Sequence, residues 1–447
     1  MEKIINTGVD VNIRNENLLT PLSIAVLNNN NEVIPALISA GANVNERIGE
    51  KSLLDIAIEN RNFEVIRHLV EAGIELIAVS RNKKEGGEYW YNWYEYYTYF
   101  MWAVNDEDVE LIELLIDLGI DINQVVPGYR FNETPVMTAI RKNNAHIVDI
   151  LIRAGASLEP QYDIRLEDHW PFDIGSALDY ALSVPKDRQN QEIINRILEE
   201  EPLVTNKDLS VSIKYSHDIE TIKKILARVQ NINDPCAPLE IPLMAAVGSF
   251  EICELLINAG ADVNLRSDAD LPHGIEWTAL HKAVCYPSDI EGIKIIRLLI
   301  KSGADVNSIS GGSSEQGVYY LNKKGIRPLM LSSDAEITRE LLNAGADVNA
   351  QDADGRTALM YSVLFNKDIE QARLLIEAGA DINKTNIRTR NALMFARATY
   401  ESNEEVINYL IRAGADTSIE DPIPDYHREG GYHSYVYVTE NFYTPDH

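Results

Sequence analysis

Residues 345–379 carry two short blocks of apolar residues at helical spacing, with polar residues between and around them. Thr357 stands directly before the first block, where a helix N-cap belongs. Gly345 can supply the positive φ that ends a preceding helix, and the polar residues 347–354 suit a hairpin. The pattern therefore predicts a hairpin followed by two short helices. The apolar positions are Ala358, Leu359 and Val363 in the first block and Ile369, Ala372, Leu374, Leu375 and Ile376 in the second.

Two short helices and a hairpin cannot bury these apolar faces alone, but stacked copies can. The sequence contains such copies. Helix ends recur at Gly8, Gly41, Gly73, Gly119, Gly155, Gly260, Gly303, Gly345, Gly379 and Gly414, most of them followed by a turn such as A-D-V-N. Helix starts recur at Thr20, Thr98, Thr134, Thr278 and Thr357, with looser copies at Ser52, Ile241, Arg327 and Asn391.

This pattern resembles the ankyrin-repeat family, whose period is about 33 residues and whose helix starts read T-P-L-H-x-A. Thr20-P-L-S-I-A and Thr278-A-L-H-K-A are close copies of that motif. The resemblance implies an all-α repeat solenoid of about eleven units, each a helix pair with a β-hairpin loop, with extended hairpin insertions. The expected parts are N-terminal repeats over 1–155 with an aromatic insertion at 74–97, degenerate repeats over 156–240, C-terminal repeats over 241–418, and a Tyr-rich acidic tail or cap over 419–447.

The degenerate stretch keeps the period while it loses the glycines that end the helices. Gly155 and Gly260 lie 105 residues apart, which equals three periods of 35. Ser176 is a plausible helix start, and residues 191–198 a second helix that ends without glycine. An enzyme hidden in this region is the alternative, but a folded catalytic insert is expected to break the period, and the period is intact.

An insertion rich in aromatic residues interrupts the N-terminal repeats. Gly73 and Gly119 lie 46 residues apart, and Thr98-Y-F-M-W-A matches a helix start, so the extra residues precede Thr98 in the hairpin region. Residues 89–102 contain ten aromatic residues, including three of the five Trp. Tyr and Trp dominate protein interfaces because they offer large contact areas at low entropic cost. The alternative is a local apolar cluster in which the insertion folds onto its own neighbours.

In ankyrin proteins the hairpin tips and the exposed side of the first helix usually contact the partner. The resemblance therefore predicts a partner-binding surface around the insertion and on the matching positions of later first helices. The predicted partner-binding residues are Tyr89, Trp90, Tyr91, Trp93, Tyr94, Tyr96 and Trp102, with Tyr361 and Phe395 at the position equivalent to Trp102.

Charge narrows the class of partner. The chain has 40 basic and 69 acidic residues and a formal net charge of −29. This balance argues against direct nucleic-acid binding, which needs cationic surface for the phosphates. It favours a basic protein partner, or simply a solvated acidic surface. A nucleic-acid mimic is a further alternative, and rows of acidic residues on one face would favour it.

Location follows from the cysteines and from the absence of targeting segments. The three cysteines, Cys236, Cys253 and Cys285, have no C-x-x-C spacing, and the odd number suits a reducing compartment. We find no signal peptide and no apolar run long enough to span a membrane. The sequence thus predicts a cytoplasmic protein without membrane contact, and a monomer.

No group of residues indicates an active site, a metal site or a cofactor. Asp352-A-D-G resembles the start of a calcium loop, but position 12 is Val363 instead of Glu, so a hairpin turn is expected. His281 occupies the His of T-P-L-H, which in the family makes structural hydrogen bonds to neighbouring backbone. His427, His433 and His447 are expected to be solvated. The predicted function is therefore non-enzymatic: binding, scaffolding or inhibiting a partner protein, with toxin neutralisation as one alternative.

Residues 419–447 fall outside the repeat pattern. They contain five Tyr, one Phe, six acidic residues and one basic residue, and Tyr432-H-S-Y-V-Y-V alternates weakly like a strand. So many aromatic residues are poor disorder formers, so a cap over the last repeat is expected rather than a free tail.

Overall fold

A computed structural model of the chain describes residues 10–80, 95–123, 134–159, 176–184, 188–200, 203–215, 218–234, 241–267, 276–285, 289–311, 325–365, 369–398 and 404–418. The chain divides into two units, Met1–Leu203 and Val204–His447. The boundary falls inside the stretch 156–240, where degenerate repeats are expected. The helix remnant before Gly8, the tip of the aromatic insertion and the segment 419–447 lie outside the described residues.

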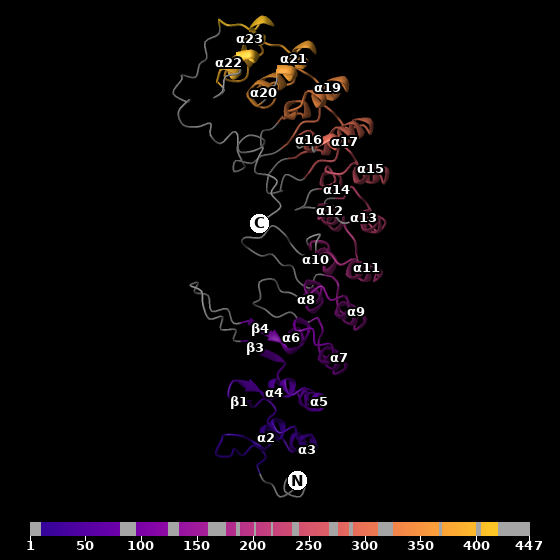
Figure 1. The fold of residues 1–447 in the computed structure, drawn as a ribbon, viewed down its shortest axis with the longest axis vertical. Coiled ribbons are helices and arrows are strands. Elements are labelled where there is room, and N and C mark those ends of the chain that lie inside the picture. The colour runs from indigo at the N-terminus through magenta and orange to yellow at the C-terminus, as the bar shows by residue number, and fades with distance from the viewer. Residues whose placement is uncertain are drawn as a thin grey trace. The chain divides into compact units, whose positions relative to one another are not determined.

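Unit 1 consists of helices in pairs, with two short antiparallel β-ladders (Figure 1). Its helices are α2 (Pro21–Leu27), α3 (Ile34–Ser39), α4 (Leu53–Glu59), α5 (Phe63–Glu71), α6 (Tyr99–Asn105), α7 (Val109–Asp117), α8 (Pro135–Arg141), α9 (Ala145–Arg153), α10 (Ala177–Leu182) and α11 (Gln191–Glu199). Strand β1 (Arg47–Ile48) pairs with β2 (Lys51–Ser52), and β3 (Ile77–Ser80) pairs with β4 (Glu95–Thr98).

Unit 2 continues the same alternation of a first and a second helix. Its helices are α12 (Asn206–Lys214), α13 (Ile219–Leu226), α14 (Pro242–Ala245), α15 (Phe250–Asn258), α16 (Ala279–Cys285), α17 (Asp289–Lys301), α18 (Pro328–Leu331), α19 (Ala335–Asn343), α20 (Ala358–Phe365), α21 (Ile369–Glu377), α22 (Ala392–Ala398) and α23 (Glu404–Arg412). An isolated antiparallel bridge joins Glu276 and Gly311 on neighbouring hairpins.

Within each unit, first helices pack on first helices and second helices on second helices. In unit 2, α16 packs on α18, α18 on α20 and α20 on α22, while α17, α19, α21 and α23 form the other row. Figure 1 shows these two rows. Leu22, Leu54 and Phe100 in unit 1 and Leu280 and Leu359 in unit 2 are fully buried, so each apolar face is covered by adjoining repeats. Repeating contacts of this kind define a helical repeat array.

Hydroxyl caps begin the first helices as the motif predicts. The side chains of Thr20, Ser52, Thr98, Thr134 and Ser176 each accept a hydrogen bond from the backbone N–H three residues later. These bonds satisfy donors that a helix N-terminus otherwise leaves unpaired. The predicted starts in unit 1, including the one at Ser176 in the degenerate stretch, are therefore confirmed.

Glycines end the second helices, and asparagines join one repeat to the next. Gly345 and Gly379 have φ of +90° and +92°, which an L side chain adopts only with strain. Asn349 Nδ2 donates to Gly379 O at 2.9 Å, and Asn349 Oδ1 accepts from Asp381 N at 2.7 Å. Asn307 makes the equivalent bonds to Gly345 and Asp347, and Asn383 makes them to Gly414 and Asp416.

Removing one amide of this ladder is expected to weaken the array measurably. Asn349→Ala deletes two hydrogen bonds between repeats, each of which contributes on the order of 1 kcal/mol, so we expect a loss of about 1 to 2 kcal/mol in the free energy of unfolding. Urea denaturation followed by circular dichroism measures it. The matched control is Asn343→Ala, at an exposed position at the end of α19, which should stay within about 0.5 kcal/mol of wild type. Equal losses for the two variants would contradict a bridging role.

Candidate protein-interaction surfaces

Unit 1 exposes large apolar side chains on its first helices. Ile24 of α2 and Trp102 of α6 occupy equivalent positions of the start motif and are 36% and 38% exposed. Leu27 is also exposed and lies three residues after Ile24, on the same side of α2. The equivalent position on α4, Ile56, is buried. We call Ile24, Leu27 and Trp102 the first-helix face.

Tyr99, the residue that follows the N-cap of α6, attaches the helix that carries Trp102 to the preceding repeat. The Tyr99 hydroxyl donates to Asp55 Oδ1 at 2.8 Å and lies 2.7 Å from Ser52 Oγ, so α6 is fastened to the start of α4. Burial raises the pKa of the Tyr99 hydroxyl well above its usual value, and it therefore stays a neutral donor. Trp102 is thus carried by a fixed helix rather than by a loop.

The ends of the aromatic insertion meet directly beside α6. Strands β3 and β4 pair with Ile77 opposite Thr98 and Ser80 opposite Glu95. Tyr96 lies on β4 opposite Val79. Among the predicted partner-binding residues, Tyr89, Trp90, Tyr91, Trp93 and Tyr94 lie outside the described residues.

Tyr361 and Phe395, which were predicted to contact a partner, are each only 5% exposed, so their assignment to an exposed surface is wrong. The Tyr361 hydroxyl donates to Asp352 Oδ2 at 2.7 Å. The Arg390 guanidinium lies 4.8 Å from the centre of the Phe395 ring, and that of Arg356 lies 5.8 Å from it. Burial raises the pKa of Tyr361, and the Asp352 carboxylate raises it further. The two rings therefore belong to the interior of the last repeats.

His281 has the structural role that its position in the motif predicts. It is fully buried on α16, its Nε2 donates to Ile326 O at 3.2 Å, and its Nδ1 accepts from Thr278 N at 3.3 Å. Burial lowers the pKa of His281 to about 4. The neutral imidazole thus ties the start of one repeat to the backbone before the next, and this prediction is confirmed.

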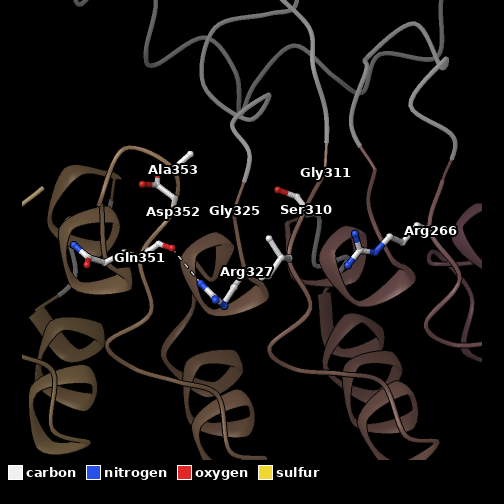
Figure 2. A pocket seen from close by; sticks show the side chains of 9 residues that line it. Arg266, Ser310, Gly311, Gly325, Arg327, Gln351, Asp352 and Ala353 are labelled. Carbon is white, nitrogen blue, oxygen red and sulfur yellow. Dashed lines mark hydrogen bonds between the residues drawn. The ribbon is translucent and has the colours of Figure 1, made fainter. Parts of the chain in front are cut away.

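An open groove lies between three successive hairpins of unit 2 (Figure 2). Its volume is about 570 Å³. Figure 2 shows Arg266 on one side of Ser310 and Gly311, and Arg327 on the other side, toward Gln351 and Asp352. Ile309 also lines the groove and is 42% exposed. We call this the hairpin groove; the sequence analysis did not find it.

Backbone contacts join the hairpins that form the floor of the hairpin groove. Ser310 N donates to Ile326 O at 2.8 Å, and Gly311 exchanges hydrogen bonds of 3.2 and 3.3 Å with Glu276 on the neighbouring hairpin. At Gly325, where φ is +91°, a Cβ would lie 3.0 Å from Ala353 N of the next hairpin. Both arginines also contact the hairpins that line the groove: Arg327 Nη1 donates to Gln351 O at 3.1 Å, and Arg266 lies 3.8 Å from Glu276.

The part of the chain that the structure describes holds no group of three residues suited to a metal ion. Asp352 Oδ1 accepts from Asp354 N and Arg356 N, which is the hairpin turn expected in place of a calcium loop. Burial raises the pKa of the Cys253 thiol to about 12. In the described residues, no helix has both the length and the apolar character needed to cross a bilayer.

The helix pairs, the caps and the amide ladder define a helical repeat protein whose open surfaces are hairpins and first helices. Comparison with known families gives the class: the family model described as ankyrin repeats (3 copies) matches residues 1–79, 100–208, 209–310 and 319–421. The chain belongs to the ankyrin-repeat family, whose repeats are generally protein–protein interaction modules. The matches cover the stretch with degenerate repeats and leave out 80–99, which contains most of the aromatic insertion.

The chain is also similar to FPV018 of Fowlpox virus (strain NVSL), which is named as an ankyrin repeat protein. The two are 30% identical over 196 residues, which are 37% of this chain and 26% of the relative. The chain thus matches about a quarter of the length of that protein.

Proposed function

We propose that this protein binds a partner protein through the first-helix face and the aromatic insertion of unit 1, and holds or inhibits that partner without catalysis. The observation that supports the proposal is Trp102, a large aromatic side chain that is 38% exposed on a helix fastened by its neighbour Tyr99. A solvent-exposed indole on a rigid element is typical of an interface hot spot. The binding residues in this proposal are Trp102 with Tyr89, Trp90, Tyr91, Trp93, Tyr94 and Tyr96.

We also propose the number of repeats and the extent of the hairpin formed by β3 and β4. We infer about eleven repeats, because the described residues contain 22 helices in pairs. We infer that residues 81–94 extend the hairpin of β3 and β4, because the two strands pair up to Ser80 and Glu95. The protein is proposed to be a cytoplasmic monomer.

The net charge gives this proposal only weak support. Acidic residues occupy the first turn of many second helices, among them Glu220, Glu251 and Glu336. The helix dipole favours a negative charge there in any protein. Lys223 lies 2.8 Å from Glu220, and Arg297 lies 2.9 Å from Glu336, so part of this charge is paired. We propose a basic partner, with a nucleic-acid mimic as the alternative.

Shortening the insertion tests the proposal without disturbing the fold. Because Ser80 pairs with Glu95, replacing residues 81–94 by Asn-Gly leaves a two-residue turn that suits a β-hairpin. We expect affinity capture with this variant, and with Trp102→Ala, to recover the wild-type partner at roughly one tenth of the wild-type amount or less, since a hot-spot residue contributes about 2 kcal/mol or more.

The matched control is Ile411→Ala, which removes a side chain that is 40% exposed on the second helix α23 and should leave capture unchanged. Melting temperatures close to wild type would show that all three variants are folded. Undiminished capture by the shortened variant and by Trp102→Ala would contradict the proposed surface. If the captured proteins bind DNA, and if added DNA displaces them from this chain, the nucleic-acid mimic is favoured instead.

A further inference from the structure

Basic residues gather on the hairpins of unit 2, against the charge of the rest of the chain. Between the ladder asparagines and the helix starts, the described residues include six basic side chains and three acidic ones. In the full sequence these hairpins hold eight basic and six acidic residues, whereas the rest of the chain holds 32 basic and 63 acidic residues. The hairpins are residues 264–277, 307–327, 349–357 and 383–391. Arg390, one of the six described basic residues, is buried against Phe395. The other five, Arg266, Arg327, Arg356, Lys384 and Arg388, are called the cationic hairpin row.

The three acidic residues among these hairpins do not neutralise the row. Asp352 accepts the Tyr361 hydroxyl and two backbone N–H groups. Glu276 lies 3.8 Å from Arg266, and Asp354 lies 3.8 Å from Arg356. A guanidinium has five donors, so Arg266 and Arg327 can each bind a further acidic group besides the contacts described here.

Apolar side chains lie between the charges of the row. Ile309 in the hairpin groove is 42% exposed, and Ile387 beside the exposed Arg388 is 68% exposed. Alternating cations and apolar positions match an extended segment that carries both carboxylates and large apolar side chains.

We propose that the segment 419–447 of this same chain docks along the cationic hairpin row and reaches the hairpin groove. The segment has the complementary chemistry, with six acidic residues against Arg428 alone, five Tyr and one Phe. Carboxylates pair with guanidinium groups, and aromatic rings accept a guanidinium on their face, as Phe395 does for Arg390.

The segment begins beside the row. The last described residues are joined to the hairpin at 383–390: Asp416 N donates to Asn383 Oδ1 at 2.7 Å, and Asn383 Nδ2 donates to Gly414 O at 3.1 Å. The 29 following residues span up to about 95 Å when extended. Neighbouring helices pack about 10 Å apart, so the hairpin groove is well within reach. Such a tether gives an effective concentration on the order of 1 mM.

Full-length variants and one peptide test this docking. The segment variant carries Glu420→Gln, Asp421→Asn, Asp425→Asn and Glu429→Gln, which remove charge from the segment and leave the repeats unchanged. The hairpin variant adds Arg266→Gln, Arg327→Gln and Arg388→Gln to those changes. The control variant instead adds Arg228→Gln, Arg339→Gln and Arg412→Gln, at exposed positions away from the hairpins. The probe is a fluorescent peptide of residues 419–447, and fluorescence anisotropy measures its binding. The salt concentration is about 50 mM, because ions screen the charges only weakly there.

We expect the segment variant to bind the peptide at least about tenfold more tightly than wild type, because the native segment competes in wild type. The hairpin variant should lose about tenfold or more of that affinity, and the control variant should retain it. Three results would each overturn the proposal. Wild type and the segment variant could bind the peptide equally, the segment variant could fail to bind it, or the hairpin changes could leave its binding unaffected. Tighter binding of a single-stranded RNA, with no competition by the peptide, would also overturn it.

Discussion

Lowering the pH from 7 to 4.5 is expected to remove about 2 to 3 kcal/mol of stability from unit 2 through His281 alone. Burial lowers the pKa of folded His281 to about 4, whereas an unfolded histidine titrates near 6.5. Between these values the unfolded chain binds the additional proton, so the free energy of unfolding falls as the pH falls. The contribution is fully present above about pH 6.5 and is lost as the pH drops through the window down to about 4.

His281→Gln isolates this contribution because glutamine does not titrate in that range. At pH 7 the variant should be less stable than wild type, since it disturbs the bonds to Ile326 O and Thr278. At pH 4.5 the difference between wild type and variant should shrink by about 2 to 3 kcal/mol. Trp277 reports the transition in urea, because it is the only Trp of unit 2 and its ring centre lies 6.2 Å from that of His281.

Leu280→Ala is the control for the acid experiment. Leu280 is as deeply buried as His281 on the same helix but carries no titratable group. The loss in this variant should be about 2 kcal/mol or more at both pH values. A stability difference for His281→Gln that does not change with pH would show that His281 is not buried as a neutral group.

Much of the fold could be predicted from the sequence because each repeat solves its local problems with a few residues. Threonine or serine before an apolar run caps a helix, as Thr20 and Thr98 do. Glycine at the end supplies the positive φ, as at Gly345. These are properties of neighbouring residues, so spacing along the chain reveals them.

The burial of the equivalent first-helix position could not be predicted in the same way. Ile24, Trp102, Tyr361 and Phe395 share one place in the repeat, yet the first two are partly exposed and the last two are buried. The difference lies in the covering side chains: Arg356 and Arg390 stack near Phe395, and Asp352 holds Tyr361. Such contacts depend on the three-dimensional pairing of long side chains from different hairpins, which the period does not encode.

The charge distribution was missed for a related reason. A net charge of −29 describes the chain as a whole and suggests a basic partner. Stacking brings Arg266 and Arg327, which are 61 residues apart, to the same groove. Two arginines far apart in an acidic chain thereby line one groove, which an argument from composition alone cannot find.

Phe395→Ala is expected to lower the free energy of unfolding by about 3 to 4 kcal/mol, the usual range for an emptied Phe site in a core. The ring is 5% exposed and lies under the guanidinium groups of Arg390 and Arg356, so its loss leaves a cavity and two partly buried cations without their ring. Trp102→Ala is the matched comparison at the equivalent position, where the exposed indole should contribute about 1 kcal/mol or less. Urea denaturation of both variants measures the contrast.

Phe395→Leu separates the two sources of this stability. Leucine fills most of the volume but offers no aromatic face, so the variant should recover most of the loss and remain about 1 kcal/mol below wild type, the size of a cation–π interaction. Equal and small effects of Phe395→Ala and Trp102→Ala would instead place Phe395 at the surface and restore it as a candidate for partner binding. The contrast between these two positions thus decides which aromatic residues of the array are available to a partner and which hold its repeats together.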